Sequence, residues 1–189
     1  MRIPSYRLGI VLAFLLQVGL LGWIVADRAM LLLHGKEIRL AVVPIDPRDI
    51  FRGDYVTLGY NISQINNSLV GGDNGFARGD TIYVAIAPEG VDWKATAITE
   101  RRPETGTYLR GVVRDLRDSN NCEGGGECLV YRVEYNLEQF FVPEGTGREL
   151  EKLRNGQHIS VDVAVANDGR AALKRLLVDG EPRYQEDLY

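Results

Sequence analysis

An uncharged apolar run near the start of the chain restricts its fold more than any other feature. The run covers Leu8–Ala26 and follows Arg2 and Arg7. As a helix, these 19 residues would span about 28 Å, close to the hydrocarbon thickness of a bilayer. Asp27 and Arg28 come directly after the run, without the Ala-x-Ala triplet of a cleavage site. The run therefore predicts an uncleaved membrane anchor in preference to a cleaved signal peptide.

The charges around the run predict which side of the membrane the later residues occupy. Positive residues stay on the cytoplasmic side, so Arg2 and Arg7 place the N-terminus inside and the remaining chain outside. Trp23 would then lie near the outer interface, where an amphipathic ring is favoured. The chain has 26 acidic and 22 basic residues, so its outer part is acidic and does not favour binding to nucleic acid.

The chain beyond the anchor is long enough for one globular core. We expect a cytoplasmic tip, transmembrane anchor and stalk over residues 1–34, one domain over 36–182 and a tail over 183–189. Leu31–Leu33 lie between the anchor and the domain. They either enter the membrane interface or cover the base of the domain, or they form a docking surface for another membrane protein.

The outer domain is predicted to be mainly β, following the N-terminal transmembrane helix. Short segments rich in β-branched and aromatic residues alternate with turn signals. About nine strands and one short helix fit either an antiparallel β-barrel or a β-sandwich. The helix is expected after Thr146, with Glu149 at capping-box spacing and Gly156 as its stop. The expected strands are IRLAVV, YVTLGY, TIYVAIA, WKATAIT, TYLRGVV, LVYRVEY, QFFV, HISVDVAVA and AALKRLLV.

The segment HISVDVAV shows the period of two most clearly. Alternation of this kind predicts a half-buried strand. One face would carry Ile159, Val161, Val163 and Val165, and the other His158, Ser160, Asp162 and Ala164.

Cys122 and Cys128 bracket a glycine-rich loop between two segments that look like the strands of a hairpin. In an oxidising compartment such a pair can close a small loop, so we expect a disulfide. A metal pair is a weaker alternative, because two thiolates do not complete a tetrahedral site and no histidine lies near them in the sequence. Two free thiols are the remaining alternative.

Catalytic motifs are scarce in this sequence. It contains neither Gly-x-Ser-x-Gly nor His-Glu-x-x-His, and its glycine runs do not fit a phosphate-binding loop. Membrane-anchored signal peptidases of the Ser–Lys type share the topology, the β-rich outer domain and an Arg-Gly-Asp turn before a strand. They carry a serine motif soon after the anchor, whereas the corresponding stretch here, KEIRLAVVPIDPRD, has no serine. The sequence therefore favours a protein without enzymatic activity and predicts no cofactor.

Carboxylates and arginines alternate in the stretch PIDPRDIFRGD. Asp46, Asp49 and Asp54 could supply oxygen ligands to a calcium ion. Arg48 and Arg52 lie between them, and a cation competes poorly for carboxylates that already have partners. We therefore expect a structural network of ion pairs here rather than a metal site.

The stretch VVPIDPRDIFRGDYVTLGY closely resembles the GDYXXLXY family of membrane-anchored bacterial proteins. FFVPEGTGRELEKLR and GRAALKRLLVDG resemble other recurrent segments of that family, so the likeness covers roughly residues 38–180. The resemblance implies a protein of the bacterial inner membrane whose domain faces the periplasm or exterior. It also implies a multi-spanning membrane protein as a companion, and no assigned biochemical activity. The family name spells Gly53, Asp54, Tyr55, Leu58 and Tyr60 here.

Two functional hypotheses follow from these observations. The first is a non-enzymatic accessory or docking subunit for another membrane protein, in which Glu144, Gly145 and Glu149 join the motif residues in a structural or docking role. The second is an anchored hydrolase or peptidase-like enzyme whose site is built from loops near Asp46, Asp54 and Glu144.

The motif itself is expected to form a turn at Gly53 followed by one strand. Leu58 and Tyr60 would then belong to the core. The buried face would carry Val56, Leu58 and Tyr60, and the other face Tyr55, Thr57 and Gly59.

Overall fold

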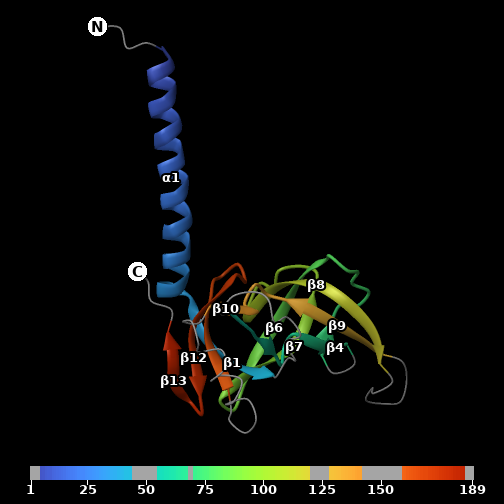
Figure 1. The fold of residues 1–189 in the computed structure, drawn as a ribbon. Coiled ribbons are helices and arrows are strands. Elements are labelled where there is room, and N and C mark those ends of the chain that lie inside the picture. Colours follow the sequence, from blue (N-terminus) through green and yellow to red (C-terminus); the bar gives the residue numbers. More distant parts are fainter. Residues whose placement is uncertain (1–4, 44–54, 68–69, 120–127, 142–158, 186–189) are drawn as a thin grey trace.

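The structure, a computed structural model, describes residues 5–43, 55–67, 70–119, 128–141 and 159–185. These residues form one helix and thirteen strands (Figure 1). The helix is α1 (Ser5–His34). The strands are β1 (Lys36–Val43), β2 (Tyr55–Thr57), β3 (Gly59–Tyr60), β4 (Gln64–Asn66), β5 (Gly71–Gly72), β6 (Thr81–Glu89), β7 (Asp92–Thr99), β8 (Thr107–Ser119), β9 (Cys128–Glu134), β10 (Gln139–Phe141), β11 (Ile159–Val165), β12 (Ala171–Val178) and β13 (Glu181–Gln185).

The helix α1 is longer than the apolar run that predicted it. It continues to His34, whereas the run ends at Ala26. Its 27 residues from Leu8 onward are long and apolar enough to cross a membrane, a property that an anchor and a signal sequence share. A helix of 30 residues is about 45 Å long, and a bilayer's hydrocarbon core is about 30 Å thick. The last turns of α1 therefore extend beyond that thickness and reach the domain (Figure 1).

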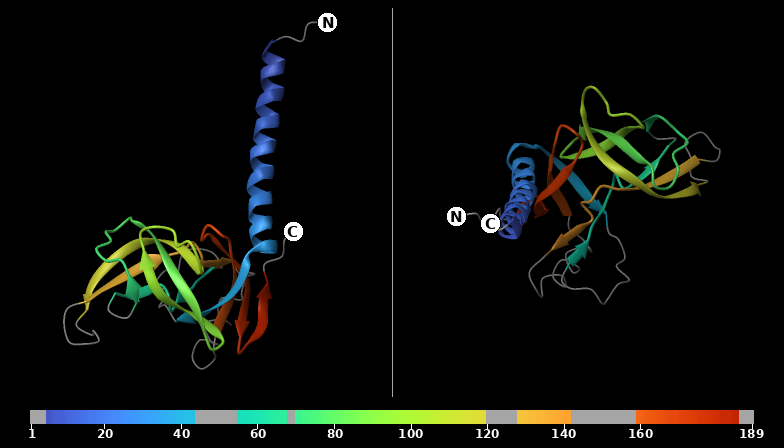
Figure 2. Two further views of the ribbon diagram at one scale, coloured as in Figure 1. Left: turned by 180° about the vertical axis from the view of Figure 1, so that it is seen from behind. Right: turned by 90° about the horizontal axis from the view of Figure 1, so that it is seen from above.

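The strands form two main sheets and one separate strand pair. The five-stranded sheet has the order β13-β12-β11-β1-β3, and the six-stranded sheet has the order β4-β9-β8-β6-β7-β5. β10 pairs with β2, and among the described strands β5 and β7 form the one parallel pair. The domain is mainly β, as predicted, and its described strands do not close into a barrel. Figure 2 shows α1 at one side of the domain rather than over its centre.

Both sheets contribute side chains to one hydrophobic core. Leu40 and Val163 enter it from the five-stranded sheet, and Val84, Leu109 and Tyr131 enter it from the six-stranded sheet. All five side chains are fully buried. Each large apolar side chain removed from water contributes roughly 1.5–3 kcal/mol, so this core holds the two sheets together.

The hairpin predicted around the cysteines is present. β8 pairs with β9 as far as Ser119, which lies opposite Cys128. Cys122 lies outside the described residues, so the Cys122–Cys128 disulfide stays a prediction. The helix expected after Thr146 also lies outside them.

β11 corrects the prediction of a half-buried strand. Ser160 and Asp162 are only 1 % and 2 % exposed, and Ala164 is fully buried. β11 is the central strand of its sheet, and the end of α1 covers part of its second face, where Leu31 and Leu32 pack against Ala164. The period of two located the strand correctly. It carried no information about a helix, distant in sequence, that covers the other face.

Two arginines flank Asp162 on that face. The sheet register places Arg39 of β1 and Arg175 of β12 directly opposite Asp162, on its two sides. Arg39 donates to Asp162 through Nε at 2.8 Å, and Arg175 donates through Nη2 at 3.1 Å. The hydrogen bond to this carboxylate raises the pKa of Arg39 above its ordinary value. A buried carboxylate without partners would be costly, so the two arginines allow Asp162 to occupy the centre of the sheet.

Candidate functional site

The GDYXXLXY motif forms two short strands in different sheets, so the prediction of one strand was wrong. β2 pairs with β10, whereas β3 pairs with β1. Leu58 lies between β2 and β3, and its N–H donates to the carbonyl of Glu138 at 2.8 Å. The motif thus marks the position where the chain crosses from one strand pair to a sheet. Its apolar pattern indicated burial but could not indicate which strand each half would join.

The core positions predicted for Leu58 and Tyr60 are confirmed, since these residues are 4 % and 1 % exposed. Gly59 is buried as well. The expected division into two faces therefore fails at Gly59, because the chain changes partners there. The side chains of residues 55–57 lie outside the described part of the chain.

Two buried tyrosines join the motif to the turn after β9. The Tyr60 hydroxyl donates to the carbonyl of Leu137 at 2.5 Å, and the Tyr135 hydroxyl donates to the carbonyl of Ile62 at 2.6 Å. Burial raises the pKa of both tyrosines well above their ordinary value, so both hydroxyls stay protonated. The Glu138 carboxylate accepts the N–H groups of Tyr135 and Leu137 at 2.7 and 2.9 Å. Tyr60 therefore fixes the position of this turn.

Most site residues predicted from the sequence lie outside the described residues. Of the motif residues that are described, Tyr55 pairs with Phe141 across β2 and β10. The described residues include no group of three or more His, Cys, Asp or Glu that could hold a metal ion. The predicted residues outside the described part are Asp46, Arg48, Asp49, Arg52, Gly53, Asp54, Cys122, Glu144, Gly145 and Glu149, together with His158.

The end of α1 packs on the outer face of β11 and β12. Leu31 and Leu32 are each 8 % exposed and contact Ala164 and Ala172. Of the alternatives considered for Leu31–Leu33, covering the base of the domain therefore holds for Leu31 and Leu32. Leu33 remains 62 % exposed.

Gly35 is the single residue between α1 and β1. Its N–H donates to the carbonyl of Leu31 at 2.9 Å. A Cβ at this position would lie 2.5 Å from that carbonyl oxygen and 2.9 Å from the Cβ of Ala164. Only glycine therefore lets the chain leave the helix this close to β11 without displacing backbone.

An ion pair between α1 and the β11–β12 turn also stabilises this junction. Arg170, in the turn between β11 and β12, donates to the Asp27 carboxylate at 2.5 and 3.1 Å and to Asp168 at 2.7 Å. Hydrogen bonds to the two carboxylates raise the pKa of Arg170. Burial alone would raise the pKa of Asp168, but hydrogen bonds from Arg170 outweigh burial and lower it. The contribution of Asp168 to stability is thus present above its ordinary pKa of 3.8 and is lost as the pH falls further.

The same turn contacts the six-stranded sheet. The carbonyl of Gly169 accepts the N–H of Arg110 at 2.8 Å, and the carbonyl of Asn167 accepts the Tyr108 hydroxyl and, at 2.8 Å, the Arg102 side chain. Gly169 has a φ of 82°, and a Cβ there would lie 3.0 Å from the Tyr108 ring. The β11–β12 turn therefore touches α1 on one side and β8 on the other.

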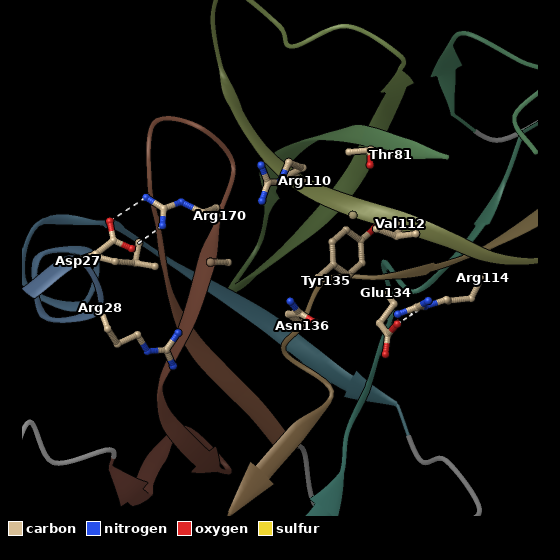
Figure 3. A pocket seen from close by; sticks show the side chains of 13 residues that line it. Asp27, Arg28, Thr81, Arg110, Val112, Arg114, Glu134, Tyr135, Asn136 and Arg170 are labelled. Atoms are coloured by element: carbon tan, nitrogen blue, oxygen red, sulfur yellow. Dashed lines mark hydrogen bonds and ion pairs between the residues drawn. The ribbon is translucent and has the colours of Figure 1, made fainter. Parts of the chain in front are cut away.

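A pocket of about 700 Å³ opens beside this turn, between α1 and β8 (Figure 3). Figure 3 shows Arg28 and Arg170 on the side of α1 and Arg110 on the side of the six-stranded sheet. Arginines outnumber carboxylates in the lining although acidic residues outnumber basic ones in the whole chain. The pocket therefore suits an anionic group. Its charged lining residues are Arg28, Arg110, Arg114, Arg170, Asp27 and Glu134.

Sequence reasoning missed this pocket. Arg28 was visible as one of the first charged residues after the apolar run, but Arg110 and Arg170 lie far from it in the sequence. Neither arginine belongs to a recognisable motif. The pairing of the β11–β12 turn with β8 brings them together.

Replacing Tyr60 with Phe should destabilise the domain. The substitution removes the hydroxyl that donates to Leu137 and leaves a buried carbonyl without its donor. We expect the free energy of unfolding to fall by about 1–3 kcal/mol, measured by denaturation of the detergent-solubilised chain. Tyr184→Phe, half-buried on the edge strand β13, is the matched control and should change stability by less than about 0.5 kcal/mol. Equal losses in the two variants would contradict the role of the Tyr60 hydroxyl.

Replacing Gly35 with Ala should open the junction between α1 and the domain. The added Cβ would contact the carbonyl of Leu31 and the side chain of Ala164, and the backbone cannot move away cheaply. We expect trypsin to cut after Lys36 roughly tenfold faster, which corresponds to about 1.4 kcal/mol less protection. Gly22→Ala, where a Cβ would meet nothing within 4 Å, is the control and should leave the rate unchanged. Unchanged cleavage in Gly35→Ala would show that the close approach does not protect the junction.

Comparisons with curated proteins and with solved structures found no significant match. The sequence model of the GDYXXLXY protein family matches residues 17–176, a range that includes the C-terminal half of α1, the motif and the β11–β12 turn. This match extends over most of the sequence and shows that the chain belongs to the GDYXXLXY family.

Proposed function

We propose that this protein is a single-pass membrane protein whose outer domain serves as a non-enzymatic accessory subunit for another membrane protein. Its location would be the bacterial inner membrane, with the N-terminus inside and the domain facing the periplasm or exterior. The long apolar helix supports the anchor, and Arg2 and Arg7 support this orientation. The observation that carries the proposal is the close junction between α1 and the domain.

This junction supports a subunit held in one orientation to the membrane. Gly35 alone separates α1 from β1, which is too short for a flexible tether. Leu31 and Leu32 pack on the sheet, and Asp27 binds Arg170 from a second direction. A domain fixed in this way can present one surface to a neighbour in the same membrane. A diffusing soluble ligand would not require a fixed orientation.

The exposed side chains at the end of α1 provide a docking surface. Met30 and Leu33 are each 62 % exposed, and residues three apart lie on the same face of a helix. Leu33 lies about 10 Å beyond Ala26, so it extends past the hydrocarbon core and most of the headgroup layer. Apolar side chains exposed at this height suit contact with another membrane protein.

The hydrolase alternative requires Asp46, Asp54 and Glu144, which all lie outside the described residues. No observation on the described part of the chain favours it over the accessory role. It therefore stays a prediction from the sequence.

Photo-crosslinking tests the docking surface in the protein's own membranes. A photoreactive amino acid at Leu33 of the full-length chain should give one discrete product with a multi-spanning membrane protein, identified by mass spectrometry. Val91, an apolar residue in the β6–β7 turn that is 70 % exposed, is the matched control position and should not give that product. Products with lipid alone from Leu33, or the same product from both positions, would contradict the proposal.

A further inference from the structure

We propose that the pocket between α1 and β8 binds the headgroup of an anionic phospholipid through its phosphate. The proposal rests on the proposed membrane anchoring and adds a ligand class to it. Three properties of the pocket support it: its height along α1, its charge and its size.

The height of the pocket matches the layer of lipid phosphates. Asp27 and Arg28 line the pocket, and they are the first charged residues after the apolar run Leu8–Ala26. Because this run matches the hydrocarbon thickness, residues just beyond it lie at the depth of the headgroups. The pocket therefore opens where an anionic phospholipid presents its phosphate.

The charge of the pocket leaves a cation available for a ligand. Arg170 already binds two carboxylates, and Arg114 pairs with Glu134. The Arg110 side chain is exposed, and none of the hydrogen bonds within the described residues uses its guanidinium. A guanidinium can donate two parallel N–H bonds to a phosphate. Arg110 is therefore the residue that would bind the phosphate directly.

The other arginines of the pocket strengthen that contact through their charge. The lining has four arginines against two carboxylates, which leaves a local excess of positive charge. The charge of Arg110 already reaches Asp168 and contributes to lowering its pKa, so charges at this corner act on one another. An anion beside Arg110 would offset the excess. The acidic remainder of the chain would repel the same anion elsewhere.

The size of the pocket favours a headgroup over a free phosphate ion. At about 700 Å³ it is within the range of sites that hold whole small molecules. Thr81 and Asn136 also line it and offer hydrogen-bonding groups away from the anchor (Figure 3). These groups suit the hydroxyls of a glycerol headgroup. A phosphate ion alone would use only the arginine side.

Lipid retention by the full-length chain tests the proposal. We would place the protein in nanodiscs with equal amounts of phosphatidylglycerol and phosphatidylcholine, transfer it to mild detergent and count bound lipids by native mass spectrometry. Phosphatidylglycerol should be retained preferentially, and Arg110→Ala should lower its retention about tenfold, as expected for one lost charge-assisted contact. The variant keeps the backbone N–H that binds Gly169, so the fold is preserved.

The matched control is Arg132→Ala. Arg132 is exposed on β9 of the same sheet and does not line the pocket, so the substitution changes the charge equally without affecting retention. Equal retention of the two lipids would overturn the proposal, as would equal losses in the two variants.

Two further measurements distinguish a failure of the headgroup assignment from a failure of the proposed function. Inorganic phosphate should displace phosphatidylglycerol only when its concentration exceeds that of the lipid more than about tenfold. Displacement at a concentration equal to that of the lipid would overturn the headgroup assignment. The intact mass of the chain purified from its own membranes tests the anchoring separately. Loss of residues 1–26 would overturn the proposed function. An intact chain without lipid preference would overturn the headgroup site alone.

Discussion

The arrangement of this protein depends on Arg170 in the β11–β12 turn, which binds Asp27 of α1 and Asp168 of its own turn. The side chains of Arg170 and Asp27 are 41 % and 39 % exposed, so water screens their attraction and the pair adds little stability. Its two-point geometry instead fixes the direction in which the turn meets α1. Packing of Leu31 on the sheet and the bond from Arg110 to Gly169 complete the contact on either side. One turn thus connects α1, the five-stranded sheet and the six-stranded sheet.

The family motif supports the same junction between α1 and the domain from within the hydrophobic core. Tyr60 donates to Leu137 and so holds the turn that follows β9. That turn carries Tyr135 and Asn136, both of which line the pocket beside α1. The second wall of the pocket therefore depends on the buried hydroxyl of a motif residue. This link explains how a motif within the core can influence a pocket on the surface beside α1.

Local patterns in the sequence predicted the elements of this fold but not their contacts. The apolar run located α1, and alternation located most of the strands and the burial of Leu58 and Tyr60, but not the short strands β4, β5 and β13. Alternation could not show that Ala164 would be covered on the outer face, because the covering helix lies far away in the chain. It also could not show that Leu58 separates two strands with different partners. The pocket was missed because strand pairing alone brings Arg110 close to Arg170.

The central claim is that the domain is held in one orientation relative to α1. The most direct test is a distance distribution measured by pulsed electron paramagnetic resonance, with spin labels at Leu16 and Val91 and the native cysteines replaced by serine. Both positions are at least 70 % exposed, so the labels should not disturb packing. The account predicts one narrow maximum for the full-length chain in nanodiscs. A broad distribution without a dominant maximum would contradict it and would show that the domain moves freely about Gly35.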